Sequence, residues 1–100
     1  MASFETHVQR ALDALPADLA AALKNVAIVV EEEHPNDPDL FGLFEEEPYL
    51  PAKVTIYRLP LVETFEDPDE LEREIRITVL HELAHYFGID EERLDELGYA

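Results

Sequence analysis

The first quarter of the chain has the apolar spacing of a helix. Its apolar residues recur at intervals of three and four positions and would share one helical face: Phe4, Val8, Ala11, Leu12 and Leu15. This spacing predicts a helical region over residues 3–24. Pro16 interrupts the region, and because proline fits the first turn of a helix, residues 18–24 are expected to form a second turn or a kinked continuation.

Two later segments have the composition of β-strands. Residues 26–31 are apolar and mostly β-branched, which predicts a buried strand, and residues 53–58 predict a second one. Residues 34–51, between the two, contain four prolines and many acids, so we expect a long excursion around a short apolar stretch. Residues 59–65 could extend the second strand or form a loop, since Pro60 would break the ladder of hydrogen bonds.

The last third of the chain begins with a long predicted helix. Asp67 or Asp69 can cap its start near Pro68, and the acids that follow suit the positive end of the helix dipole. The helix is expected to run to Phe87, where Gly88 ends it.

A short final helix is predicted over residues 91–97. Asp90 is available as its N-cap, and Leu94 and Leu97 would form its inward face. The whole chain is 100 residues long, which is enough for one hydrophobic core. Residues 1–100 are therefore interpreted as a single domain.

The charge of the chain narrows the range of partners. Asp and Glu number 24 and Lys and Arg number 7, which gives a formal net charge of −17. Nucleic acids and anionic membrane surfaces require a basic face, so this charge argues against both as partners. It does not indicate disorder, because 47% of the residues are hydrophobic. Cationic peptides, metal ions and neutral substrates are the expected partners.

Three absences in the sequence bear on location and chemistry. The chain has no cysteine, which excludes disulfides, thiolate metal ligands and a cysteine nucleophile. Its first residues lack the basic and apolar regions of a signal peptide. The longest apolar run, residues 26–30, is too short to span a membrane. We therefore expect a cytoplasmic location.

The candidate chemistry lies near the end of the long helix. Residues 81–90 read His-Glu-Leu-Ala-His-Tyr-Phe-Gly-Ile-Asp, which is the pattern H-E-x-x-H-x-x-G-x-x-D. H-E-x-x-H on a helix is a known zinc-binding motif. At 100° per residue, His81 and His85 lie within about 40° of each other and one turn apart, so both rings can reach one metal ion. Glu82 lies about 60° from His85, close enough to act on a water molecule without being a ligand.

The helix around this motif is predicted to be buried over most of its surface. A wide arc of the helix, about 200°, is apolar: Ile75, Ile77, Val79, Leu80, Leu83, Ala84, Tyr86 and Phe87. The two histidines and Glu82 share a narrow polar seam with Glu74 and Thr78. Because ionisable groups on a buried helix need partners, a metal ion is a good partner for this seam.

A third metal ligand is expected after the helix. Gly88 tolerates a positive φ and lets the chain turn, so Asp90 could fold back as an oxygen ligand. Two imidazoles and one carboxylate would leave one coordination position for water, as in catalytic zinc sites. Glu82 would accept the proton of that water and pass it to a leaving amine. Asp90 could instead only cap the final helix, and the two roles compete for one carboxylate.

The same residues also have structural interpretations. His81 and His85 could be partly buried histidines bonded to nearby carboxylates, and Glu82 could be a surface salt-bridge residue. His7 and His34 are expected to be exposed and unrelated to the motif. Three tyrosines could stabilise an oxyanion, although a core or surface role is favoured for each: Tyr57, Tyr86 and Tyr99.

Several segments of the chain together match the sequence pattern of a known protein family. They are Arg73, Ile75, His81-Glu82-x-x-His85, Gly88 and Asp90 with the following Glu-Glu-Arg-Leu-x-Glu-Leu-Gly, the upstream Leu40-Phe41-Gly42-Leu43-Phe44, and Pro51 with Ile56-Tyr57-Arg58. In these segments the chain resembles the bacterial minimal zincin-like metallopeptidases, over about three quarters of its length. The motif is also similar to that of the larger metzincin peptidases, whose third ligand is usually His. Here Asp90 takes that place, and no Met follows it.

The resemblance implies a fold and a site. The implied fold is α+β and zincin-like, with a small mixed sheet packed on an N-terminal helix and an active-site helix, and with a short C-terminal helix. The implied site holds Zn²⁺ on His81, His85 and Asp90, and Glu82 is its general base.

Three functions follow from these observations. The first is a zinc metallopeptidase that cleaves peptides or unfolded proteins, with basic ones favoured by the acidic surface and held extended along a sheet edge near residues 53–58. The second is a metal-binding or protein-interaction module that keeps the zincin fold with weak or no catalysis, motivated by the ten residues that follow Asp90. The third, a metal-dependent nuclease, is disfavoured by the position of Glu82 and by the charge.

Overall fold

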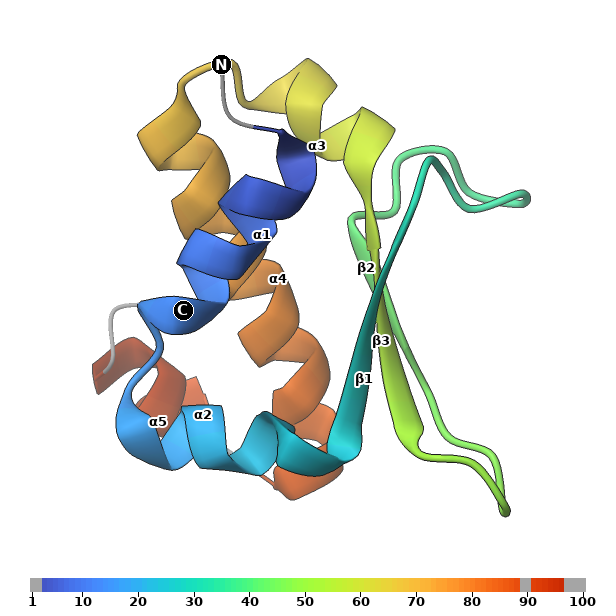
Figure 1. The fold of residues 1–100 in the computed structure, drawn as a ribbon, viewed down its shortest axis with the longest axis vertical. Coiled ribbons are helices and arrows are strands. Elements are labelled where there is room, and N and C mark those ends of the chain that lie inside the picture. The colour runs from blue at the N-terminus through green and yellow to red at the C-terminus, as the bar shows by residue number, and fades with distance from the viewer. Residues whose placement is uncertain (1–2, 89–90, 97–100) are drawn as a thin grey trace.

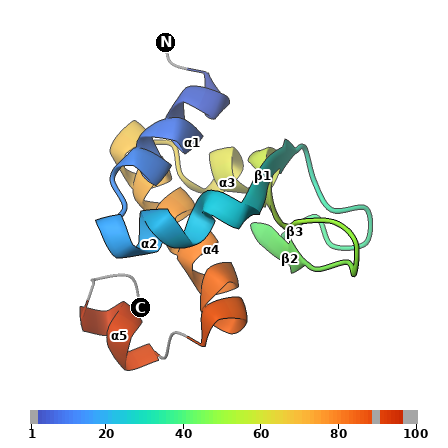
Figure 2. The same ribbon diagram turned by 60° about the horizontal axis from the view of Figure 1, so that its bottom comes forward.

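The protein consists of a layer of helices packed on one small sheet. The structure, a computed structural model, describes residues 3–88 and 91–96. Its helices lie together on one side of the sheet (Figure 1), and the β2–β3 hairpin extends away from α1 and α2 (Figure 2). In chain order the elements are α1 (Phe4–Asp13), α2 (Ala17–Ala22), the 3₁₀ turn η1 (Leu23–Asn25), β1 (Val26–Glu31), β2 (Gly42–Glu45), β3 (Ala52–Tyr57), α3 (Arg58–Thr64), α4 (Pro68–Phe87) and α5 (Glu91–Glu96).

The sheet is mixed, and its strands lie in the order β1-β3-β2. β1 pairs with β3 in parallel, from Val26 opposite Ala52 to Glu31 opposite Tyr57. β2 pairs with the other side of β3 in antiparallel fashion, with Gly42 opposite Ile56. Because β3 is the central strand, it has no open edge, and the expectation of a peptide bound along residues 53–58 is wrong. The open edges of the described sheet belong to β1 and β2.

Within the described residues, the larger of two clusters of buried apolar residues lies between the sheet and helices α1, α3 and α4, and a smaller one joins Leu15 and Leu19 to Leu80 of α4. Most of the best-buried side chains of the larger cluster, which is the main hydrophobic core, come from β3 and from one face of α4, and α1 and α3 contribute one each. The fully buried residues of this core are Ala11, Val54, Ile56, Leu61, Ile75, Val79 and Leu83. The α+β fold expected from the sequence is therefore confirmed, with α4 as its central helix.

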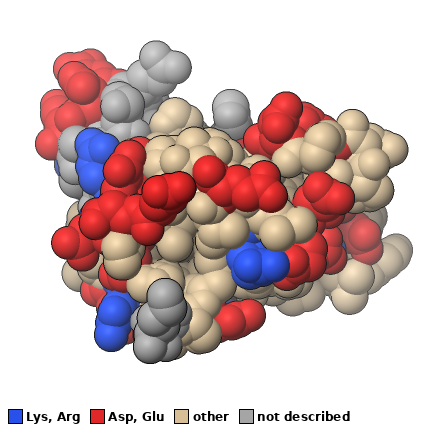
Figure 3. Space-filling view, turned by 90° about the horizontal axis from the view of Figure 1, so that it is seen from above, with Lys and Arg blue, Asp and Glu red and all other residues tan. Residues whose placement is uncertain are grey.

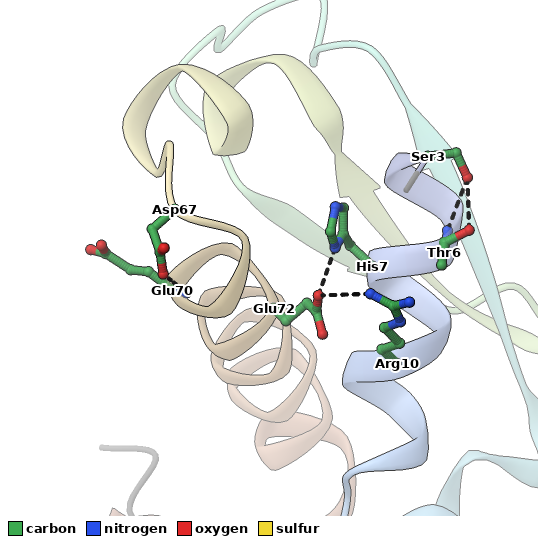
Figure 4. Close-up of polar contacts among 7 residues, drawn as sticks. All are labelled: Ser3, Thr6, His7, Arg10, Asp67, Glu70 and Glu72. Atoms are coloured by element: carbon green, nitrogen blue, oxygen red, sulfur yellow. Dashed lines mark hydrogen bonds and ion pairs between the residues drawn. The ribbon is translucent and has the colours of Figure 1, made fainter. Parts of the chain in front are cut away.

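Both ends of α4 are set by local chemistry. The Asp67 carboxylate accepts a hydrogen bond from the Glu70 backbone N–H at 3.0 Å, and Pro68 is the first helical residue (Figure 4). At the other end Gly88 has a φ of +65°, and its N–H donates to the carbonyl of Ala84. These are the start and stop that the sequence predicted.

Two segments differ from expectation. Within the predicted excursion, residues 42–45 form strand β2. Residues 58–64 form α3, neither extended strand nor loop. Pro60 is the third residue of α3, where a helical N–H has no intrahelical partner, so the missing donor costs nothing. Burial of Pro60 and the neighbouring Leu61 then holds the helix against the core.

A polar contact joins α1 to α4. The His7 ring Nδ1 lies 2.6 Å from Oε2 of Glu72, and Arg10 Nη1 lies 3.9 Å from the same oxygen (Figure 4). Only 12% of the His7 side chain is exposed, so the expectation that His7 is exposed is wrong. His34 is half-buried too, with its ring edge-on to Tyr57. Neither histidine lies on α4.

Charges at the end of β1 and the start of α3 are also paired. Arg58 Nε donates to Glu32 Oε1 at 2.8 Å, and its Nη2 contacts the other oxygen. Hydrogen bonding from this guanidinium holds the pKa of the exposed Glu32 below its ordinary value. Burial, and to a lesser extent the charges of Glu31 and Glu45, raises the pKa of Tyr57 above its ordinary value. Tyr57 is a core residue, which is the role favoured for it from the sequence.

The final helix, α5, is present as predicted. Arg93 Nη2 lies 2.9 Å from Asp18 Oδ2, which connects α5 to α2. The side chain of Leu94, together with Asp90 and Leu97, lies outside the described residues. None of the helices within residues 3–88 and 91–96 combines the length and the apolar composition that a membrane crossing requires.

Candidate active site

The H-E-x-x-H motif occupies the last two turns of α4. The opposite side of this part of the helix is anchored in the core, since Val79, Leu80 and Leu83 are fully buried. On the motif side His81 is exposed and Glu82 is half-buried. The side chain of His85, and all of Asp90, lie outside the described residues. Of the predicted polar seam, His81, Glu82 and Glu74 are at least partly exposed, whereas Thr78 is buried and Ile77, expected in the apolar arc, is half-buried.

Strand β2 lies directly against this seam. The Phe44 backbone N–H donates to Oε2 of Glu82 at 3.1 Å. The Tyr57 N–H donates to the Phe41 carbonyl at 2.9 Å, so Phe41 is a hydrogen-bonded partner of β3. Because such pairs alternate along an antiparallel ladder, the backbone groups of Gly42 and Phe44 point away from β3. Glu82 therefore contacts the open edge of β2.

An open hollow of about 390 Å³ adjoins His81 and Glu82. The chain leading into β2 forms one wall and α4 forms the other. Leu40, Phe41 and Ile77 give the hollow apolar surface. Its full lining is Asp37, Asp39, Leu40, Phe41, Gly42, Glu74, Ile77, Thr78, His81 and Glu82. A space of this size is typical of sites that take small molecules or single side chains.

The hollow is strongly acidic. Asp37, Asp39 and Glu74 line it in addition to Glu82. The cation found at Glu74 is Arg73, whose Nη1 lies 3.7 Å from Oε1 and whose side chain is more than half exposed. Arg73 thus offsets one of the four carboxylates at most. The hollow therefore favours a cationic occupant.

The described residues include only part of the predicted metal site. His81 and Glu82 are brought together at the hollow, and an imidazole and carboxylates are ligands that Zn²⁺ accepts. Within residues 3–88 and 91–96 no group of three candidate ligands is assembled. The predicted ligand set also requires the side chain of His85 and Asp90, which lie outside that part of the chain. Of the three predicted ligands only His81 has a described side chain, and its imidazole is a donor that Zn²⁺ accepts, so the ligand set stays a prediction.

Three residues make contacts at the site that the sequence did not predict: Gly42, Phe44 and Thr78, although the sequence does place Thr78 on the polar seam. Gly42 lies so close to Thr78 that a Cβ built on it would be 2.5 Å from the Thr78 methyl carbon. An isolated glycine in an apolar strand-like run is a signal of close backbone approach, and Leu-Phe-Gly-Leu-Phe contains one. That signal marks the position of contact but not its partner on α4.

The fold and the motif together define a zincin-like α+β domain. A sequence model of the zincin-like metallopeptidases matches residues 23–99, so the chain belongs to this family. The match begins at η1 and includes all three strands and the helices from α3 to α5. A comparison with curated proteins gives no match.

Proposed function

We propose that the protein is a zinc-dependent peptidase that hydrolyses peptide bonds, with Glu82 as general base. The observation that carries this proposal is the position of Glu82. Its carboxylate lies beside His81 in an open hollow and contacts the open edge of β2. A base at that place is within reach of a peptide held by the strand.

The proposed metal ligands are His81, His85 and Asp90. When bound there, Zn²⁺ would supply a Lewis acid that polarises a peptide carbonyl and lowers the pKa of a water molecule. Gly88, with its left-handed conformation, turns the chain directly after the helix and before Asp90. This turn is what an Asp90 ligand requires, and Asp90 could still serve only as a cap of α5.

Glu82 moves the proton in the proposed reaction. It accepts a proton from the attacking water and returns it to the amine that leaves, so the carboxylate is restored after each cycle. The hydrogen bond from Phe44 orients this carboxylate relative to β2. Orientation matters because a general base must lie within hydrogen-bond distance of the proton that it removes.

The proposed substrate is an extended peptide that adds to the open edge of β2. The outward backbone groups of Gly42 are suited to pairing with such a peptide, beside the Phe44 N–H that holds Glu82. We further propose that basic peptides are favoured. The stem of a Lys or Arg side chain would lie on the apolar surface of the hollow, and its charge would meet the carboxylates that line it.

The test compares zinc content and peptide cleavage in the wild type and in Glu82→Gln. We expect the wild type to bind zinc by mass spectrometry and to cleave unstructured basic peptides. Glu82→Gln should lower kcat by at least about a hundredfold, because general base catalysis contributes about that much. Glu70→Gln is the matched control, since it removes one exposed carboxylate from the first turn of the same helix. Equal activity of Glu82→Gln and wild type would contradict the proposal.

A second candidate is a metal-binding or protein-interaction module without efficient catalysis. The observation in its favour is the turn between β2 and β3, where Tyr49 is 97% exposed and Leu50 is 63% exposed. Exposed large apolar side chains side by side are typical of contact surfaces. Zinc binding without any turnover of peptides would favour this candidate over the peptidase.

A further inference from the structure

We propose that Gly42 and Thr78 are positioning residues that set the distance between the open edge of β2 and Glu82. Their contact determines where the backbone of a bound peptide lies relative to the general base. The effect of this contact on catalysis rests on the proposed function. The effect of the contact on the distance between β2 and α4 does not depend on that function.

Gly42 is required for space and not for its backbone conformation. Among the described glycines only Gly88 has a positive φ, so the backbone at Gly42 is accessible to other residues. A Cβ on Gly42 would lie 2.5 Å from Thr78 Cγ2 and 3.2 Å from the Thr55 carbonyl oxygen. Carbon atoms in contact prefer about 3.5–4.0 Å, so an alanine would force β2 or α4 to move by about 1 Å.

Thr78 is held in place and cannot easily make room. Its hydroxyl donates to the Glu74 carbonyl at 2.8 Å, one turn earlier on α4. The side chain is buried, and rotating its methyl group away from Gly42 would break this hydrogen bond. The methyl group of Thr78 therefore acts as a fixed stop against β2.

The contact is linked to Glu82 by the spacing of both elements. Thr78 and Glu82 are one turn apart on α4, and Gly42 and Phe44 are two residues apart on β2. The Gly42–Thr78 contact and the Phe44–Glu82 hydrogen bond are thus consecutive contacts between the same strand and helix. A Cβ on Gly42 would also lie 3.8 Å from Glu82 Cγ. Moving the first contact must change the second.

The experiment measures the effect of Gly42→Ala in three backgrounds. With Thr78 present, we expect Gly42→Ala to lower kcat/KM by about tenfold to a hundredfold, because a shift of about 1 Å is costly in catalysis. Thr78→Ser removes the methyl group and keeps the hydroxyl, so in that background Gly42→Ala should cost less than about threefold. The loss of kcat/KM that remains in this background is attributed to the close approach of the alanine Cβ to the Thr55 carbonyl oxygen, at 3.2 Å. Thr78→Val keeps a methyl group, so in that background the full loss should persist.

A second measurement does not depend on catalysis. Hydrogen exchange of the Phe44 amide should accelerate at least tenfold in Gly42→Ala and return toward the wild-type rate when Thr78→Ser is added. If Gly42→Ala fails to fold, recovery of folding by Thr78→Ser but not by Thr78→Val gives the same support. Equal effects of Gly42→Ala in the Thr and Ser backgrounds would overturn the inference. If the wild type shows no cleavage that depends on Glu82, the proposed function fails, and the exchange rates still decide the role of the contact.

Discussion

At the scale of single residues, two glycines meet different physical needs. Gly42 lies where β2 touches α4, and only the lack of a side chain lets the two elements meet. Gly88 has open space around it, since a Cβ at this position would have no neighbouring atom within 4 Å, but its φ of +65° is strained for other residues. The first requirement is set by a partner distant in sequence, and the second is purely local.

Gly88→Ala should lower the free energy of unfolding by about 1 kcal/mol, because a side chain in the left-handed region is disfavoured by about that amount. Gly88→Asn should cost clearly less, since asparagine tolerates this conformation. Urea denaturation of the three proteins measures both differences. Equal stability of the alanine variant and the wild type would show that the end of α4 is not held in this conformation in solution.

The site residues show which contacts can be predicted from the spacing of residues along one helix. His81 and Glu82 were assigned from the motif alone, because the spacing of residues on one helix fixes their relative direction. The part played by Phe44 could not be assigned in this way. Its backbone reaches Glu82 across 38 positions of sequence, and no spacing rule encodes that approach. The chemical roles of His81, Glu82, His85 and Asp90 all stay predictions.

At the scale of elements, a helix or strand was predicted correctly where the sequence carries a chemical signal at each of its ends. The bounds of α4 were predicted because Asp67 and Gly88 mark both of its ends. β2 was missed because its four residues stand in a segment rich in proline and acids, where only pairing with β3 makes them a strand. α3 was missed because Pro60 was interpreted as a breaker of strand hydrogen bonds, although it is equally suited to the first turn of a helix.

The polar contact between His7 of α1 and Glu72 of α4 is predicted to stabilise the packing of these two helices. His7 and Glu72 should show a coupling energy of about 1–2 kcal/mol in a double-mutant cycle with His7→Ala and Glu72→Ala. Both side chains are at most 15% exposed, and a hydrogen bond to a charged group is worth about 1.5–3 kcal/mol when protected from water. Chemical denaturation at about pH 7 gives the four stabilities.

The matched control is the pair of Lys53 and Glu45 on β3 and β2. Its atoms lie 3.7 Å apart, and both side chains are more than 40% exposed. Coupling within this pair should be below about 0.5 kcal/mol, since water screens exposed charges. Similar coupling in the two pairs would mean that α1 is not held to α4 by the buried contact.

At the scale of the whole molecule, negative charge dominates. Five of the seven Lys and Arg residues already lie within 4.0 Å of a carboxylate in the described part of the chain: Arg10, Lys53, Arg58, Arg73 and Arg93. Most of the 24 carboxylates therefore have no basic side chain to balance them. Figure 3 shows one face on which Asp and Glu spread over the surface with few basic side chains among them.

This imbalance predicts that salt stabilises the fold. The molecule measures 32 × 31 × 21 Å, so at about 10 mM salt, where charges interact over about 30 Å, nearly all its carboxylates repel one another. At about 1 M salt the range falls to about 3 Å. Tm should rise by at least about 5 °C between these conditions, which corresponds to about 1 kcal/mol for a domain of this size.

Two substitutions separate this effect from other actions of salt. Glu46→Gln and Glu47→Gln remove exposed carboxylates from the turn between β2 and β3. Together they should raise Tm at low salt and have little effect at high salt. A Tm that falls or stays level as salt increases would contradict the dominance of repulsion.

The two open edges of the sheet give this repulsion a protective effect. An unpaired strand edge is a template for any extended chain, another copy of the same protein included. Mutual repulsion would oppose edge-to-edge contact of identical chains, while the basic peptide proposed as substrate would be attracted to the same place. The same net charge that would draw the proposed substrate to β2 would therefore also protect the edge strands from aggregation.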